Sequence, residues 1–475
     1  MLKHIRFFHY DKIKYASFLI FTTCLLSLFL SAGAMAQSND FETDETTIKI
    51  RQQDQSRFMT DEAQRLYRSF ADAIYQIQVI DTTSAKKSSI GSGFAFGDQG
   101  FIATNYHVVA DAVQRPSQNR IEFLNETGES GRLKLIAIDI VNDIAILEPE
   151  DKQTSLSTAQ NPLVLGSTPR LSKGAKIFSL GNPHDIGFTI IEGTYNGFDL
   201  SLNPKIHFSG ALNSGMSGGP ALDHRGQVIG LNVSTAGHQI SFLIPVEYLK
   251  DLAEKVKTQD KDEKPKDFTL NAISIIEEQL YNFQDEYMSD LINAEWETVS
   301  FGSVMVPGRI APFFKCWGGV GHTDGDPYQH HRSTCTSQER IFLEENNDNE
   351  RPVTTGTLIY RYDAFWANPD LNPQRFYTLY QNHYGLPLDA YRNADEQNVT
   401  SFACDTRFIT LAQKKWKIST CTRSYKKYPR LIDMHVYLAQ LGQARQGLLI
   451  SFVLQGVSRE NSIQFLQKFL STIKA

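Results

Sequence analysis

Between Ala71 and Ile244 the chain is a succession of short apolar runs, each broken by Gly, Asn or Asp. Examples are "AIYQIQVI", "GSGFAFG", "RLKLIAIDI", "KIFSLG", "FTIIEGTYNG" and "GQVIGLNV". Many short strands separated by turn signals are typical of a β-sandwich or a β-barrel. We therefore predict a mostly β domain here, which the helical pattern of "VEYLKDLAEKVK" closes.

A second domain is predicted after a charged, proline-containing linker at 258–268. Apolar residues then recur at three- and four-residue steps between Ile273 and Leu291, which predicts an amphipathic helix. Later runs such as "WKISTCTRSY" and "QGLLISFVLQG" alternate as strands do, and "SIQFLQKFLSTI" is again helical in period. Residues 269–475 are thus expected to form an α+β domain with an antiparallel sheet and a terminal helix, of unknown function.

The first residues predict export. A basic leader precedes the apolar stretch from Ala16 to Ala34, and "AMA" before Gln37 fits a signal-peptidase site. We predict a signal peptide over 1–36, a polar segment over 37–64, and a periplasmic or extracellular protein. The alternative is an uncleaved membrane anchor, because the stretch is just long enough to span a bilayer.

Four cysteines remain after the predicted cleavage, all in the last third of the chain. Their spacing does not fit a CxxC zinc site, and export favours two disulfides. Four cysteines allow three connectivities. Sequential pairing is the simplest: Cys316–Cys335 across a surface loop, and Cys404–Cys421 across a strand hairpin.

A glycine-rich stretch, "NSGMSGGPALDHRGQVIGLNV", contains Ser217 and has suitable partners upstream. His107 ends an apolar strand, and Asp143 directly precedes "IAIL". A serine nucleophile needs a base to accept its proton and a carboxylate to orient that base. Asp139 lies close to Asp143 in the chain and is the competing carboxylate.

The blocks "ATNYHVV", "NDIAIL" and "GMSGGP…GQVIGLNV" resemble the catalytic blocks of trypsin-like serine peptidases, and most resemble the Deg/HtrA branch. The resemblance implies a chymotrypsin-like pair of six-stranded β-barrels over 65–257. It also implies His107 as general base, Asp143 as orienting acid and Ser217 as nucleophile. The N–H groups of Gly215 and Ser217 would then form the oxyanion hole.

By the same resemblance, Ala211 floors the substrate pocket and Val233 and Ser234 border it. An uncharged floor favours a small or medium apolar residue before the scissile bond. Two features depart from the family. Met216 stands where Asp or Asn is common, which argues against a charge-pair zymogen switch. In addition, no PDZ-like carboxylate-binding loop is recognisable after Asp267.

Other partners are not indicated. The net charge of −6 gives no reason to expect nucleic acid, and the membrane is expected to matter only through an uncleaved leader. "HTDGDPYQHH" holds metal-capable side chains, but these are expected in a polar loop, so no metal and no cofactor are predicted. The basic stretch 407–430, with Trp416, Tyr425 and Tyr428, either binds an anionic surface or, as we prefer, forms an exposed sheet face.

Together these features predict an exported serine endopeptidase that acts on proteins or peptides, with no indication of its oligomeric state. The alternative is a catalytically weak protease fold that serves as a binding or chaperone module of the cell envelope. An esterase is a third possibility, which paired peptide and ester assays would separate.

Overall fold

The computed structural model describes residues 61–475 except 152–161, 236, 238, 259–267, 346–351, 385–393 and 395. The predicted signal peptide, most of the polar segment and most of the linker therefore lie outside the described residues. The last residues of the polar segment belong to a helix over 61–70. Within the described residues, no helix is long and apolar enough to span a membrane.

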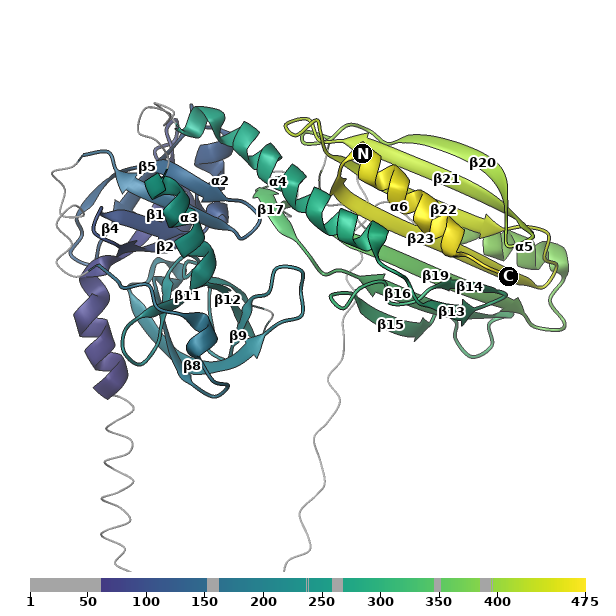
Figure 1. Cartoon of the computed structure of the whole chain (residues 1–475), viewed down its shortest axis with the longest axis horizontal. Helices are drawn as coiled ribbons and strands as arrows, with labels where there is room; N and C mark the ends of the chain where they lie inside the picture. Colours follow the sequence, from purple (N-terminus) through teal and green to yellow (C-terminus); the bar gives the residue numbers. More distant parts are fainter. Residues whose placement is uncertain are drawn as a thin grey trace, which may run out of the picture. The chain divides into compact units, whose positions relative to one another are not determined.

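Two closed six-stranded antiparallel barrels form the first part of the chain (Figure 1). Around the first barrel the strand order is β1-β2-β3-β6-β5-β4, and around the second it is β10-β11-β12-β9-β8-β7. The first barrel consists of β1 (Ile74–Asp81), β2 (Lys87–Phe96), β3 (Phe101–Thr104), β4 (Asn119–Leu124), β5 (Ser130–Asp139) and β6 (Ile144–Pro149). The second consists of β7 (Lys176–Gly181), β8 (Thr189–Phe198), β9 (Ile206–Phe208), β10 (Pro220–Leu222), β11 (Val228–Thr235) and β12 (Ser241–Pro245). The predicted barrel pair is confirmed.

Short helices join these strands. Helix α2 (Tyr106–Gln114) follows β3, and α3 (Val246–Thr258) follows β12 as the predicted closing helix. The 3-10 turns in the described part of the barrels are η1 (Ala71–Ala73), η3 (Thr168–Arg170) and η4 (Pro183–Asp185). In α3, apolar side chains at three- and four-residue spacing face the core, among them Leu249, Leu252 and Val256.

The C-terminal part is built on a seven-stranded antiparallel sheet of order β15-β16-β19-β23-β22-β21-β20. Its strands are β15 (Lys315–Val320), β16 (Tyr328–Thr336), β19 (Leu358–Ala367), β20 (Ala403–Leu411), β21 (Lys414–Ser424), β22 (Ile432–Gln440) and β23 (Gln446–Val457). Two strand pairs accompany it, β13 (Thr298–Phe301) with β14 (Val304–Pro307), and β17 (Ile341–Glu344) with β18 (Val353–Thr355). Its helices are α4 (Phe268–Asn293), α5 (Pro373–Asn382) and α6 (Arg459–Thr472). The predicted α+β architecture is confirmed.

Helix α6 lies against the sheet (Figure 1). Phe465 and Phe469 are fully buried and contact Phe452 of β23, with ring centroids 5.5 and 4.9 Å apart. Ser458 caps the helix, since its side chain accepts a hydrogen bond from the N–H of Asn461. The helical period of the last residues thus translates directly into a buried aromatic face.

Both predicted disulfides are present, each between directly opposite residues of neighbouring strands. Cys316 pairs with Cys335 across β15 and β16, and Cys404 pairs with Cys421 across β20 and β21. The Cα–Cα distance is 4.0 Å in both. The prediction of a surface loop between Cys316 and Cys335 was wrong, because the glycines in "KCWGGV" concealed a strand that pairs along its whole length with β16.

Helix α4 belongs to two hydrophobic cores. Ala272, Ile276 and Leu280 pack in the core of the first barrel, and Met288 and Leu291 pack in the core of the C-terminal sheet. The side chain of Gln279 also bonds the backbone at the end of β5, accepting from Ile140 and donating to Ile138, both at 2.8 Å. The barrels and the C-terminal sheet are therefore joined by continuous packing.

Candidate active site

His107 lies in the first turn of α2, where backbone N–H groups have no partner within the helix. The turn between β5 and β6 supplies the missing acceptors. The N–H of Tyr106 donates to the carbonyl oxygen of Asp143 at 3.2 Å, and the N–H of His107 donates to its Oδ1 at 2.9 Å. Asn105 Nδ2 donates to the same carbonyl oxygen at 2.9 Å. Asp143 thus fixes the helix start as well as the histidine.

The two side chains meet directly. Nδ1 of His107 lies 2.7 Å from Oδ2 of Asp143, and the side chains are 25% and 15% exposed. Asp143 itself has φ of +57°, a conformation that Asp and Asn tolerate better than most residues. Asp139, the competing carboxylate, instead accepts from the backbone and side chain of Asn142 at 3.0 and 2.8 Å. Asp139 therefore stabilises the turn that presents Asp143.

Electrostatics at this pair favour a charged imidazole. Burial opposes the charge of His107, but the charge of Asp143 and its hydrogen bond outweigh burial, with a further contribution from Glu345. The net result is a pKa of His107 raised above 6.5. A histidine held in this way has one defined tautomer and a stabilised protonated form, as a general base requires.

Ser217 lies in the loop between β9 and β10, and Ser92 of β2 holds this loop in place. The N–H of Ser92 donates to the carbonyl oxygen of Ser217 at 2.7 Å, and its hydroxyl donates to the carbonyl oxygen of Gly215 at 2.7 Å. A Cβ on Gly218, which has φ of +82°, would lie 2.7 Å from the backbone nitrogen of Asn105. The serine loop therefore lies against the residues that begin α2.

Asn232 fixes the other side of the same loop. Its Nδ2 donates to the carbonyl oxygens of Leu180 and Met216 at 2.9 and 3.1 Å, and its Oδ1 accepts from Ser179 at 2.7 Å. Asn232 is fully buried. No role was predicted for Ser92 or Asn232 from the sequence. A polar residue inside the apolar run "VIGLNV" was the signal that could have identified the latter.

The candidate oxyanion hole is formed by the backbone around Ser217. Gly215 has φ of +91°, and a Cβ there would lie 2.4 Å from the carbonyl oxygen of Asn182, so only glycine fits. In the described part of the chain, the N–H groups of Gly215 and Ser217 have no hydrogen-bond acceptor. Met216, between them, is fully buried in the core of the second barrel. The loop thus exposes two donors while its apolar side chain anchors it.

A cavity of about 450 Å³ adjoins His107 and Asp143, and Val233 and Ser234 are among its lining residues. Ser217 Oγ donates to the carbonyl oxygen of Val233 at 3.4 Å, and no hydrogen bond joins it to His107 within the described residues. Ala211 is exposed and lies outside the lining of this cavity. The structure thus brings His107, Asp143 and Val233 to one cleft, whereas Ala211 is not part of it.

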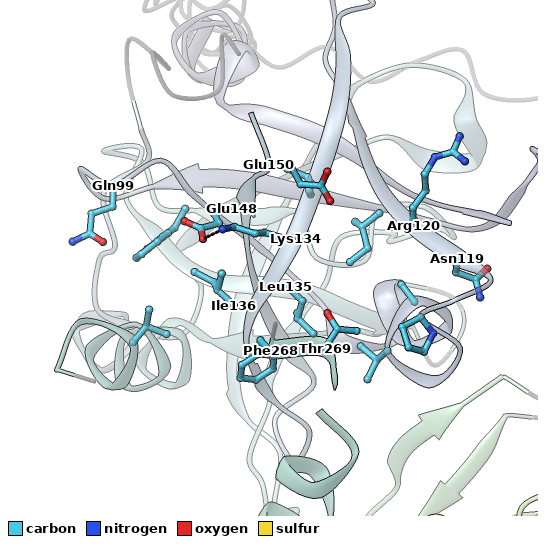
Figure 2. A pocket seen from close by; sticks show the side chains of 17 residues that line it. Gln99, Asn119, Arg120, Lys134, Leu135, Ile136, Glu148, Glu150, Phe268 and Thr269 are labelled. Atoms are coloured by element: carbon cyan, nitrogen blue, oxygen red, sulfur yellow. Dashed lines mark ion pairs between the residues drawn. The ribbon is translucent and has the colours of Figure 1, made fainter. Parts of the chain in front are cut away.

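A larger cavity of about 770 Å³ lies elsewhere on the first barrel (Figure 2). Its lining comes from β3 to β6, the end of α2, the end of α3 and the start of α4, and it includes the Lys134–Glu148 ion pair at 2.8 Å. No histidine, serine or cysteine lines it. Cavity size therefore does not single out a candidate centre, and we take the smaller cavity beside the His107–Asp143 pair as the candidate site.

Packing accounts for two other regions considered in the sequence, the metal-capable segment "HTDGDPYQHH" and the basic stretch 407–430. His330 of the "HTDGDPYQHH" segment is buried and bonds Asp363 at 2.7 Å, and the described residues contain no group of three metal-capable side chains. In the basic stretch, Trp416, Tyr425 and Tyr428 are buried rather than displayed with the charges. The aromatic residues there contribute to the core, which agrees with the preferred interpretation of a sheet face.

The paired barrels and a histidine–aspartate pair at a cleft define a chymotrypsin-like peptidase fold, and comparison with known proteins agrees. Residues 91–231 match the trypsin-like peptidase domain family. This region is therefore similar to trypsin-like peptidase domains, and several of its relatives are described as Do-like or DegP-like proteases, the branch that the sequence motifs resemble.

Two curated relatives illustrate the similarity. Protease Do-like 5, chloroplastic, of Arabidopsis thaliana is 31% identical over 35% of this chain and 57% of its own length. A probable periplasmic serine endoprotease DegP-like of Pseudomonas fluorescens is 31% identical over 36% of each chain. The crystal structure of Deg5 is 27% identical, with a TM-score of 0.37 over 42% of this chain and 96% of that chain. The chain thus spans 57% or less of the length of these curated relatives.

Proposed function

We propose that this protein is a serine endopeptidase in which Ser217 is the nucleophile, His107 the general base and Asp143 the orienting acid. The 2.7 Å contact between His107 and Asp143 at the edge of a cleft carries the proposal. The Deg relatives of residues 91–231 and the position of the serine loop beside α2 support it.

The reaction follows from these groups. Ser217 Oγ attacks the scissile carbonyl carbon while Nε2 of His107 accepts the hydroxyl proton, and the carbonyl oxygen becomes an oxyanion. The N–H groups of Gly215 and Ser217 donate to that oxygen; one such donor is typically worth about 10²–10³ in rate. His107 then protonates the leaving amine, and the C–N bond breaks to leave an acyl-enzyme. Water, deprotonated by His107, releases the acid and restores the serine.

Covalent labelling tests the proposal most directly. A fluorophosphonate probe is expected to modify the full chain at Ser217, because only an activated serine beside an oxyanion hole displaces the probe's fluoride at a useful rate. Ser217→Ala is expected to abolish labelling. Ser214→Ala is the matched control, since Ser214 is exposed in the same loop and is expected to retain labelling. Labelling that survives in Ser217→Ala contradicts the mechanism.

Residue preference before the scissile bond is a second expectation. Ala211 does not line the 450 Å³ cavity, but from the trypsin-like resemblance we infer that it floors the pocket for that residue. Peptides with Val, Ala, Ile or Leu there should then be cleaved faster than those with Lys or Arg. The reason is that a basic side chain would lose its hydration without a carboxylate to pair with. Cleavage-site profiling of a peptide library measures this. A clear preference for basic residues would show that Ala211 does not occupy the pocket floor.

A binding module without strong catalysis is the second candidate, and one observation favours it. The hydroxyl of Ser217 contacts the carbonyl oxygen of Val233 and not His107. Catalytic hydrogen bonds are often loose before substrate binds, so we favour the peptidase. The labelling experiment separates the two.

We further propose that the protein is exported and acts on protein or peptide substrates. The apolar leader before Gln37 and the description of the Pseudomonas relative as probably periplasmic support export. Periplasmic and secreted destinations both agree with disulfides in the C-terminal sheet.

A further inference from the structure

The C-terminal domain is bound to the helix that carries His107. The hydroxyl of Tyr106 donates to the carbonyl oxygen of Leu343 in β17 at 2.8 Å. At the other end of α2, Gln114 Nε2 donates to the hydroxyl of Tyr428 at 2.9 Å. Lys427 Nζ bonds both Gln114 Oε1 and Glu344 Oε2, at 2.8 and 2.7 Å. This largely buried network holds β17 in a fixed position relative to the reactive histidine.

The side chain of Phe342 reaches the histidine itself. Its ring meets that of His107 edge-on, with centroids 5.8 Å apart, and it also contacts Tyr106 at 6.4 Å. Phe342, Phe313 and Arg340 line one side of the 450 Å³ cavity, and residues of the barrels such as Val141 and Val233 line the other. The cleft beside His107 is thus formed by two domains.

Strand β11 provides an open edge at this cleft. Its partner β10 reaches only as far as Leu231, whereas β11 continues to Thr235. In the described residues, positions 233–235 have no strand partner on that side, while β12 pairs with the other. An extended peptide can add to such an edge through main-chain hydrogen bonds, and its alternate side chains then meet the surrounding walls.

Three acidic and three basic side chains line the cleft: Asp143, Asp199 and Glu339, and Lys205, Lys315 and Arg340. Lys315 and Arg340 are exposed, and within the described residues neither has a carboxylate partner. Of the three carboxylates, Asp143 bonds His107. Asp199 accepts hydrogen bonds from Ser201 and from the backbone of Lys205. Burial raises the pKa of Glu339, although Lys205 opposes the shift.

We propose that the C-terminal domain forms a wall of the substrate cleft and selects extended polypeptides by residues before the scissile bond. An apolar side chain packs between Phe342, Val141 and Val233, and an acidic side chain further upstream pairs with Arg340 and Lys315. Phe342 and Arg340 are then specificity-determining residues of the proposed peptidase, on which this inference rests.

Two substrates distinguish substrate selection by the C-terminal domain from a contact that only holds His107 in place. One is an acetyl-valine thioester, which reaches only the site at Ser217. The other is a six-residue peptide with Val immediately before the cut, Leu one residue upstream of Val, and Asp two residues upstream of Leu. For Phe342→Ala, kcat/KM on the peptide is expected to fall about tenfold, mostly through KM, because an apolar contact of this size is worth about that much. The thioester rate and fluorophosphonate labelling should stay within about twofold.

Arg340→Glu gives the second test, since Arg340 is exposed and its replacement disturbs no packing. Cleavage of the Asp peptide should fall about tenfold, and that of the matched Asn peptide should change little, because only the former has a charge to repel. The control variants are Phe408→Ala on β20, whose side chain is 75% exposed, and Arg375→Glu on α5, which is exposed. Both are expected to behave as wild type.

Equal losses on thioester and peptide would overturn the proposal, because Phe342 would then act only through His107. So would no loss on either substrate, or a gain on both, which would make β17 a blocking segment. If the wild-type chain is not labelled at Ser217, the proposed function fails. Peptide binding to Ser217→Ala, measured by fluorescence anisotropy, then tests separately whether the C-terminal domain forms a wall of the cleft. Weaker binding on adding Phe342→Ala or Arg340→Glu supports the wall, and unchanged binding contradicts it.

Discussion

His107→Ala is expected to lower kcat for peptide cleavage by about 10⁶, because loss of the base leaves Ser217 protonated and unreactive. The imidazole has no substitute within reach, since Asp143 is the one side chain that hydrogen-bonds to it in the described structure. Steady-state cleavage of the six-residue peptide, with active-site titration of the wild type, measures the loss. KM should change little, as the imidazole contributes mainly to the transition state.

His224→Ala is the matched control for this variant. His224 is an exposed histidine of the second barrel, and its only hydrogen bond is from Arg65 to its backbone carbonyl oxygen, within the described residues. Its replacement should leave kcat unchanged. A loss in His107→Ala of less than about tenfold would show that the serine is activated by another group or is not the nucleophile.

Asp143→Asn is expected to lower kcat by about 10⁴ while leaving the fold intact. An amide in place of the carboxylate can donate to Nδ1 of His107 and so stabilise the wrong tautomer. Asparagine tolerates the φ of +57° at this position, so the turn should survive. Circular dichroism and thermal unfolding check the fold, and peptide cleavage measures the loss.

The pH profile of the same variant adds an independent measurement. Asp143 raises the pKa of His107 against the effect of burial. In the proposed mechanism the neutral imidazole is the base. Wild-type activity should therefore rise with pH through a value above 6.5, and residual activity of Asp143→Asn should rise at a lower pH. Asp139→Asn is the comparison: Asp139 bonds Asn142 in the turn that presents Asp143 and does not contact His107, so kcat should fall far less and the pH midpoint should stay that of the wild type. A loss of 10⁴ in Asp139→Asn instead would reassign the carboxylate.

Much of the fold is visible in local patterns. The alternation of the barrel strands and the helical periods of α3, α4 and α6 are properties of consecutive residues, and each element appears in the structure where its pattern predicts it. The disulfide pairing was also predictable, because neighbouring strands of one hairpin bring their cysteines together. Local signals failed at β15, where two glycines weaken the strand pattern.

The candidate site also contains residues that the sequence could indicate and residues that it could not. Residue types at His107, Asp143 and Ser217 indicate their chemistry because few side chains can act as base, orienting acid and nucleophile. The roles of Ser92 and Asn232 depend on hydrogen bonds between strands far apart in the chain, such as Ser92 to Gly215 and Asn232 to Leu180. No periodic pattern in the sequence encodes those pairs.

Local patterns in the chain are therefore enough to predict the two-barrel domain, the residue types proposed for catalysis and the disulfide-bonded sheet that follows. The position of Phe342 beside His107, and the contact of Tyr428 with α2 in place of an exposed basic face, follow from the packed structure alone. The physical reason is that hydrophobic burial is not directional. An apolar side chain such as Phe342 is stabilised by burial against any apolar surface, so its residue type does not specify its partner. The packed arrangement of α2, α4 and β17 selects that partner.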